Sequence, residues 1–237
     1  MTDEPSSERP SEVRALPHEE HASLTARMSA YRQESARRRP EFAHAYDALI
    51  DRLGRIDWSA AGPQVGDSLP EFNLPDASGR IVSLSSLLQN GPVVVSLNRG
   101  HWCPYCRYDL RALAAVQHEI EALGAQVVSI MPDAAAYTQG YADQNALPFP
   151  LLSDMDNGYA LSLGLVYWAG ADLQRLYEQA GIALDSYQRN AGYLLPVVAK
   201  FVLRQDRTIA ARYIDVDFRT RSEPAEIVEA LRALKTS

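Results

Sequence analysis

The sequence predicts an α/β fold, in which a layered sheet of buried strands is flanked by helices and preceded by a helical extension. Three continuous apolar runs, at residues 92–98, 125–131 and 197–203, are typical of strands buried on both faces. The segments between them carry apolar residues at spacings of three and four, which indicates amphipathic helices. Buried strands that alternate with helices form layered α/β proteins.

The beginning of the chain differs from the rest. Residues 1–21 are rich in charge and proline, and we expect them to form a disordered tail. From residue 22 to 53, apolar residues recur at helical spacing on either side of the sequence RRRPE, which predicts two helices. We assign residues 22–62 to this helical extension and residues 63–237 to the main domain. A glycine- and proline-containing linker at 59–70 joins them.

The main domain opens with a predicted β-hairpin at residues 72–84, whose turn is Asp76–Gly79. The run 92–98 then leads into a helix over Cys103–Leu123. The remaining elements are a strand, a helix, a short strand, a segment of helical or irregular pieces, a strand pair and a closing helix that Ser222 is expected to cap. Their predicted ranges are 125–131, 134–146, 149–154, 155–192, 197–203 with 208–216, and 222–234.

Composition excludes several classes of function. The formal net charge of -7 argues against nucleic acid or an anionic membrane as the main partner, because both attract excess Lys and Arg. No apolar run approaches the roughly 20 residues that span a bilayer. The N-terminus lacks the apolar core of a secretory signal, so we expect a cytoplasmic protein. We expect no cofactor, since no haem, flavin or nucleotide motif appears.

The only two cysteines of the chain, Cys103 and Cys106, lie at the junction of a strand and a helix. Pro104 suits a first helical turn, so Cys103 is expected at the helix N-terminus and Cys106 one turn later. Free N–H groups and the helix dipole stabilise a thiolate there and lower the thiol pKa. Arg99 adds positive charge, and Trp102 shields the sulfur from water. This pattern favours attack on a peroxide or a disulfide.

Two other interpretations of the pair are weaker. A zinc site needs about four ligands, and His101 with the two cysteines supplies only a partial set. A structural disulfide would suit an oxidising compartment better than the reducing cytoplasm, and the sequence Trp-Cys-Pro-Tyr-Cys at a strand-to-helix junction favours a redox centre over two inert buried thiols. We therefore expect no metal and a redox function for the pair.

The segment RGHWCPYCRYDLRAL, residues 99–113, resembles the active-site segment of peroxiredoxin-like proteins of the AhpC/TSA group, within the thioredoxin-fold superfamily. Segments at 65–95, 147–165, 195–203 and 213–234 also resemble that group, so the likeness covers roughly residues 64–234. The resemblance implies a thioredoxin-like fold with a central mixed sheet flanked by helices. It also implies a peroxide substrate, a thioredoxin-like reductant and, from the family alone, a homodimer.

The resemblance leaves the roles of the two cysteines open. In the thioredoxin register, Cys103 attacks and Cys106 resolves the mixed disulfide. In the peroxiredoxin register, Cys106 takes the peroxidatic position and Cys103 closes the disulfide. Helix-end electrostatics favours Cys103, whereas the peroxiredoxin register gives a slight preference to Cys106.

One position departs from both parent families. Val198 stands where peroxiredoxins carry an arginine that polarises the peroxide and where thioredoxins carry a proline. Arg99 is the expected substitute cation, while Arg219 and Arg221 are expected to lie on the surface. We therefore keep three hypotheses: a thiol peroxidase, an oxidoreductase acting on protein disulfides, and a non-catalytic redox-sensing or binding module.

Overall fold

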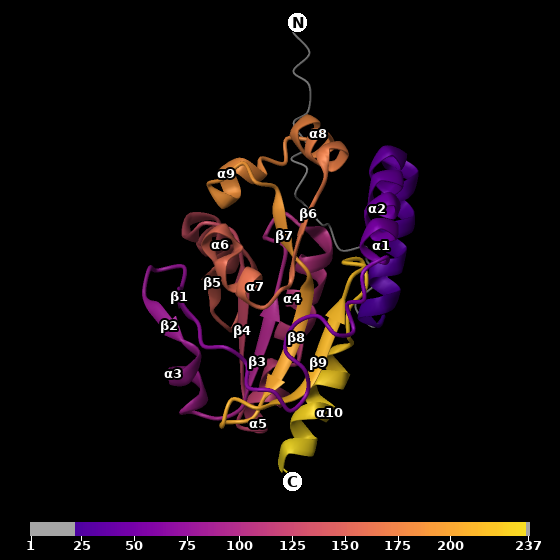
Figure 1. Ribbon diagram of the computed structural model, residues 1–237. Coiled ribbons are helices and arrows are strands. Elements are labelled where there is room, and N and C mark those ends of the chain that lie inside the picture. Colours follow the sequence, from indigo (N-terminus) through magenta and orange to yellow (C-terminus); the bar gives the residue numbers. More distant parts are fainter. Residues whose placement is uncertain (1–21, 236–237) are drawn as a thin grey trace, which may run out of the picture.

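The computed structural model describes residues 22–235 and contains a central five-stranded sheet (Figure 1). The strand order is β5-β4-β3-β8-β9. β3 is parallel to β4, β4 is parallel to β5, and β8 is antiparallel to both β3 and β9, so the sheet is mixed as predicted. The strands are β3 (Val93–Leu97), β4 (Gln126–Met131), β5 (Leu151–Ser153), β8 (Val198–Leu203) and β9 (Ile209–Asp215).

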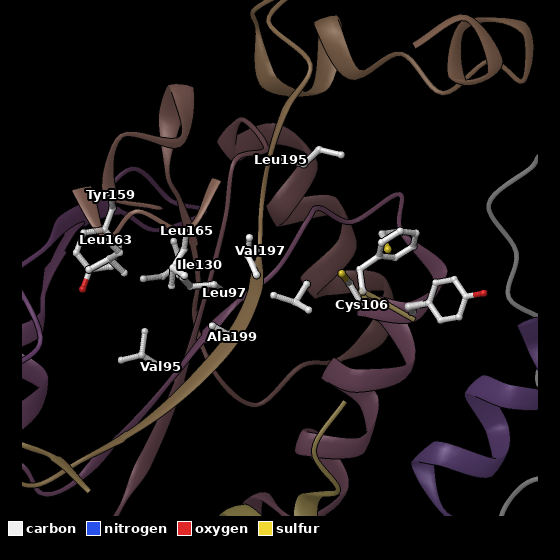
Figure 2. Close-up of a cluster of buried hydrophobic side chains, with 14 of the residues drawn as sticks. Val95, Leu97, Cys106, Ile130, Tyr159, Leu163, Leu165, Leu195, Val197 and Ala199 are labelled. Atoms are coloured by element: carbon white, nitrogen blue, oxygen red, sulfur yellow. The ribbon is translucent and has the colours of Figure 1, made fainter. Parts of the chain in front are cut away.

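Both faces of the sheet are buried, which explains the continuous apolar runs. On one face Val94, Val127 and Val202 pack against helices. Those helices are α4 (Pro104–Ala115), α5 (Gln117–Ala122), α6 (Ala135–Asn145) and α10 (Pro224–Lys235). On the other face, Val95 and Ile130 join a second cluster, of which Figure 2 shows a part. Neighbouring strand residues serve opposite faces because side chains alternate along a strand.

Smaller elements cover the second face. β1 (Asn73–Pro75) and β2 (Ile81–Ser83) form the predicted hairpin, and α3 (Leu84–Leu88) follows it. The segment 155–192, expected to be helical or irregular, contains a short 3-10 turn and three helices, together with one unpredicted strand of a second small sheet. These are η1 (Met155–Asn157), α7 (Gly158–Ser162), β6 (Val166–Trp168), α8 (Ala171–Gln179) and α9 (Leu184–Gln188), with β7 (Leu194–Pro196) pairing to β6.

The predicted helical extension is confirmed as α1 (Leu24–Arg38) and α2 (Pro40–Leu53), which break at Arg39 before a proline at the first helical position. The Glu223 carboxylate accepts hydrogen bonds from the first backbone amides of α1, at 3.0 and 2.8 Å. Buried residues of both helices belong to the same core as the sheet. The boundary at 62–63 therefore remains a division made on sequence, and the predicted tail 1–21 lies outside the described residues.

Two local predictions differ from the structure. The helix expected over 103–123 bends at Val116, whose amide bonds to the Leu113 carbonyl one residue nearer than in an α-helix, so α4 and α5 are separate. The hydroxyl of Ser222 accepts a hydrogen bond from Lys200, at 3.2 Å, and the closing helix begins two residues later. Within residues 22–235, no helix combines the length and apolar character that crossing a bilayer requires.

Candidate active site

The two cysteines lie at the junction of β3 and α4, as the sequence predicts. Cys103 is the N-cap residue of α4, and Pro104 occupies the first helical position. Gly100 makes the turn with φ +141, and a Cβ there would approach Trp102 Nε1 to 2.5 Å. Only glycine suits this close approach, so the turn that presents Cys103 depends on Gly100.

Both thiols are free and buried, but they face different surroundings. Both belong to the core cluster that covers the second face of the sheet, and Figure 2 shows Cys106 within it. Cys103 also lies in the wall of a cavity of about 680 Å³ above the N-terminus of α4, and Cys106 is absent from the lining of that cavity. A small molecule that enters this cavity would meet Cys103 before Cys106.

Arg99, which follows β3, contacts both sulfurs. Its side chain is completely buried, and its Nη1 lies 3.7 Å from Cys103 Sγ. Its backbone N–H donates to Cys106 Sγ at 3.4 Å, and its Nη2 donates to Tyr177 Oη at 2.8 Å. No Asp or Glu in the described residues pairs with the Arg99 guanidinium, so a Cys103 thiolate is its natural counter-charge.

Aromatic rings enclose the Arg99 guanidinium. Its central carbon lies 3.6 Å from the ring centroid of Phe218 and 5.0 Å from that of Trp102. Trp102 in turn packs edge-on against Tyr177, with the ring centroids 5.2 Å apart. The sequence expected Trp102 to shield the sulfur, and the structure brings its buried ring to this site. Water is excluded from the guanidinium, which strengthens its electrostatic effect on nearby groups.

The expectation that Arg219 and Arg221 lie on the surface is wrong. Both are buried, because the segment after β9 folds back over α4. Arg221 Nη2 lies 3.4 Å from Cys106 Sγ, and Arg219 pairs with Asp217 at 2.7 Å. Val198 is buried at the start of β8 and lines a small cavity together with Arg221. Arg221 therefore brings a positive charge to the region where Val198 has none.

Arg221 is held by a buried charge cluster that sequence reasoning missed. Asp109, one turn after Cys106 on α4, pairs with Lys200 Nζ at 2.7 Å and with Arg221 Nε at 3.5 Å. The three side chains are each at most 4% exposed. The sequence signal for this cluster was Asp109, a charged residue on the face of α4 that packs against the sheet. Its partners Lys200 and Arg221 could not be predicted from it, because they lie far away in sequence. The cluster orients Arg221 toward Cys106.

The surroundings push the two thiol pKa values apart. Burial alone would raise the pKa of Cys103, but the adjacent Cys106 thiol and the guanidiniums of Arg99 and Arg221 lower it to about 5. Burial and the neighbouring Cys103 thiolate raise the pKa of Cys106. The pair therefore holds one negative charge near neutral pH, on the sulfur that faces the cavity.

His101 is engaged with an acidic residue and not with the cysteines. Its backbone N–H donates to Asp133 Oδ2 at 2.6 Å, and its Nδ1 lies 2.9 Å from the same oxygen. Its ring stacks on Tyr137 with the centroids 5.3 Å apart. In the described part of the chain, no three His, Cys, Asp or Glu side chains gather as metal ligands would.

Comparison with known proteins supports the resemblance. The model of the AhpC/TSA family matches residues 65–212. Peroxiredoxin Q, chloroplastic, of Oryza sativa subsp. japonica is 34% identical over 110 residues, which are 46% of this chain and 50% of that protein. The putative peroxiredoxin bcp of Haemophilus influenzae is 28% identical over 151 residues, 63% of this chain and 95% of that protein. The chain spans about half the length of several curated relatives that it matches.

A solved structure shows the same fold. The crystal structure of peroxidoxin BcpB from Mycobacterium tuberculosis superposes with a TM-score of 0.57 at 24% identity, over 72% of this chain and 97% of that one. The thioredoxin-like fold and the mixed central sheet predicted from the sequence are thereby confirmed. The two extension helices and Arg221 lie outside the residues that the family model matches.

Proposed function

Because this chain belongs to the AhpC/TSA family, we propose that it is a thiol peroxidase in which Cys103 attacks the peroxide and Cys106 closes a disulfide. This assignment reverses the slight preference for Cys106 that the peroxiredoxin register gave. The observation that carries it is the position of Cys103 in the cavity wall, beside the Arg99 guanidinium, with a pKa lowered to about 5. Only the thiolate is a strong nucleophile, and Cys103 is the thiolate that a substrate meets.

The first step is attack of the Cys103 thiolate on one peroxide oxygen. A sulfur–oxygen bond forms as the oxygen–oxygen bond breaks, and the leaving oxygen takes a proton to give water or an alcohol. Cys103 becomes a sulfenic acid. Arg99, at 3.7 Å from the sulfur, stabilises the thiolate before attack and the negative charge that moves onto the leaving oxygen.

The second step joins the two cysteines. The Cys106 sulfur attacks the sulfenic sulfur of Cys103, and hydroxide leaves with the Cys106 proton as water. Arg221, at 3.4 Å from Cys106 Sγ, favours loss of that proton by stabilising the developing thiolate. The product is a disulfide, and a thiol reductant must return two electrons to restore the pair. The expected thioredoxin-like reductant and the homodimer remain predictions.

Intact mass after one equivalent of hydrogen peroxide tests the proposal on the reduced wild type, Cys103→Ser and Cys106→Ser. We expect the wild type to lose a pair of hydrogen atoms within seconds. Cys106→Ser should gain one oxygen as a sulfenic acid, while Cys103→Ser should react no faster than a free cysteine. Oxygen gain in Cys103→Ser alone would reverse the roles, and slow reaction of all three proteins would reject the peroxidase.

A disulfide oxidoreductase is the second candidate, because a nucleophilic cysteine at the start of a CxxC helix also suits attack on disulfides. The same thiolate, Cys103, would carry that activity. Reduction of a model protein disulfide at a rate that peroxide does not compete with would favour this function over the peroxidase.

A further inference from the structure

The cavity at Cys103 is much larger than a peroxide molecule requires. Its volume of about 680 Å³ falls in the range of roughly 300–1,000 Å³ typical of sites for drug-sized ligands. One wall comes from α1 and the residues that follow it, the opposite wall from α6, and the floor from the start of α4. The helical extension therefore contributes a wall that the family core alone lacks.

The charge of the cavity lining is opposite to that of the whole chain. Four arginines line it against one glutamate, whereas the chain carries a formal net charge of -7. These arginines are Arg38, Arg39, Arg99 and Arg107. Glu34 pairs with Arg38 at 2.6 Å, which leaves an excess of positive charge. Such a lining favours an anionic ligand.

Three buried polar atoms of residues that line the cavity have no hydrogen-bond partner among the described residues. They are Arg99 Nε, Trp102 Nε1 and Tyr141 Oη, on residues that are 0%, 8% and 3% exposed. Buried donors in native proteins are almost always paired. These atoms are covered by the lining, so a ligand with acceptor oxygens would pair them after lining side chains shift, and carboxylates are the strongest acceptors that arginine meets.

We propose that this cavity binds a small thiol that bears carboxylates, and that this thiol is the reductant of the Cys103–Cys106 disulfide. The inference rests on the proposed peroxidase cycle. Neither sulfur has exposed surface, so any reductant needs lining side chains to shift before it reaches Cys103, and a folded protein would also have to bring its cysteine to the bottom of a hollow between α1 and α6. A small acidic thiol fits the volume and the charge of this hollow.

The reduction balances with two molecules of the thiol. The thiolate of the first attacks Cys103 Sγ in the cavity floor, forms a mixed disulfide and expels Cys106 as a thiolate beside Arg221. The second attacks the sulfur of the bound thiol, releases Cys103 as a thiolate beside Arg99 and leaves as a small-molecule disulfide. Two electrons pass from the two thiols to the protein, and Cys106 regains a proton from water.

Glutathione is the probe, since it carries two carboxylates, and 2-mercaptoethanol is the uncharged reference. The full-length protein is first converted to the disulfide with a chemical oxidant, so reduction is measured without any need for peroxidase activity. We expect glutathione to saturate the wild type and 2-mercaptoethanol to react in proportion to its concentration. Arg39→Gln should slow reduction by low glutathione about 10-fold and leave 2-mercaptoethanol unchanged.

Arg37→Gln is the matched control, because Arg37 lies two residues before Arg39, in the last turn of α1, but is absent from the cavity lining. It should behave as the wild type with both thiols. Equal effects of the two substitutions would overturn the proposal. It would also be overturned if thioredoxin reduces the protein disulfide while glutathione reduces it no faster than 2-mercaptoethanol does. A third outcome would also overturn the proposal. If Arg39→Gln is oxidised more slowly by a carboxylate-bearing hydroperoxide but is reduced by glutathione at the wild-type rate, the cavity binds the oxidant and not the reductant.

The failure of this inference is distinguishable from failure of the peroxidase. Slow oxidation of the reduced wild type by hydrogen peroxide rejects the proposed function, whatever reduces the disulfide. Rapid oxidation with no response of glutathione reduction to Arg39→Gln rejects only the assignment of the cavity.

Discussion

The two cysteines of the CxxC turn have different surroundings, although they lie only one helical turn apart. Cys103 faces a cavity and the Arg99 guanidinium, which aromatic rings enclose and which no carboxylate within residues 22–235 neutralises. Cys106 faces the core and Arg221, whose charge Asp109 shares with Lys200. The unneutralised cation lies on the side that a substrate reaches. Identical residues one turn apart thus acquire different pKa values from charges that the tertiary fold supplies.

The largest expected effect is a loss of stability when Asp109, on the core side of the site, is replaced. Asp109→Asn would leave Lys200 and Arg221 buried without a counter-charge. We expect the free energy of unfolding to fall by about 3–5 kcal/mol, measured by denaturant titration. Glu119→Gln is the control, since Glu119 and Arg232 form an exposed pair at 3.1 Å, and it should cost less than about 1 kcal/mol. Equal losses in the two variants would contradict a structural role for the buried cluster.

On the cavity side of the site, the pKa and the reactivity of Cys103 depend on the charge of Arg99. Arg99→Met keeps an unbranched side chain between the rings but removes the charge beside Cys103. The pKa of Cys103 should rise by about one to three pH units, and peroxide reaction at neutral pH should slow by up to about 10-fold as the thiolate fraction falls. Ultraviolet absorbance of the thiolate follows the titration. Arg111→Met, on the exposed surface of α4, should leave the titration unchanged. A Cys103 pKa that does not change in Arg99→Met would contradict the proposed role of Arg99.

A third expected effect is a dependence of the free energy of unfolding on pH. The folded pKa of Cys103, about 5, is below that of an unfolded thiol, about 8.5. Between those values the unfolded chain binds a proton that the folded protein does not, so the reduced protein gains stability as pH rises, by at most about 1.4 kcal/mol per pH unit. This contribution disappears as pH falls through about 5. Cys103→Ser should lack the slope, and parallel unfolding curves for both proteins would contradict the lowered pKa.

The sequence predicts the parts of the site that local patterns determine. The apolar run before Asn98 and the proline after Cys103 are enough to place the cysteines at a strand-to-helix junction. Arg221 lies 115 residues from Cys106 in sequence, and nothing around it distinguishes it from a surface arginine. The fold-back of the segment after β9 brings it inward. Long-range packing of this kind is invisible to periodicity and turn signals.

The same limit explains why the roles of the cysteines stayed open. Helix-end electrostatics and family register point to different sulfurs, and neither counts the charges that other elements deliver. The aromatic enclosure of Arg99 by Phe218 and Trp102, and the cavity wall from α1, both depend on contacts between distant segments. The small sheet of β6 and β7 was missed because each strand has only three residues.

Site-resolved alkylation tests the central claim most directly. Reduced protein would be exposed briefly to iodoacetamide at about pH 6, where a Cys103 thiolate exists and an ordinary thiol is protonated. Peptide mapping then identifies the labelled residue. The same brief labelling at a low, non-denaturing urea concentration controls for access to the buried sulfurs. We predict that Cys103 carries the label and Cys106 does not. Preferential labelling of Cys106 under both conditions would contradict the assignment of Cys103 as the nucleophile.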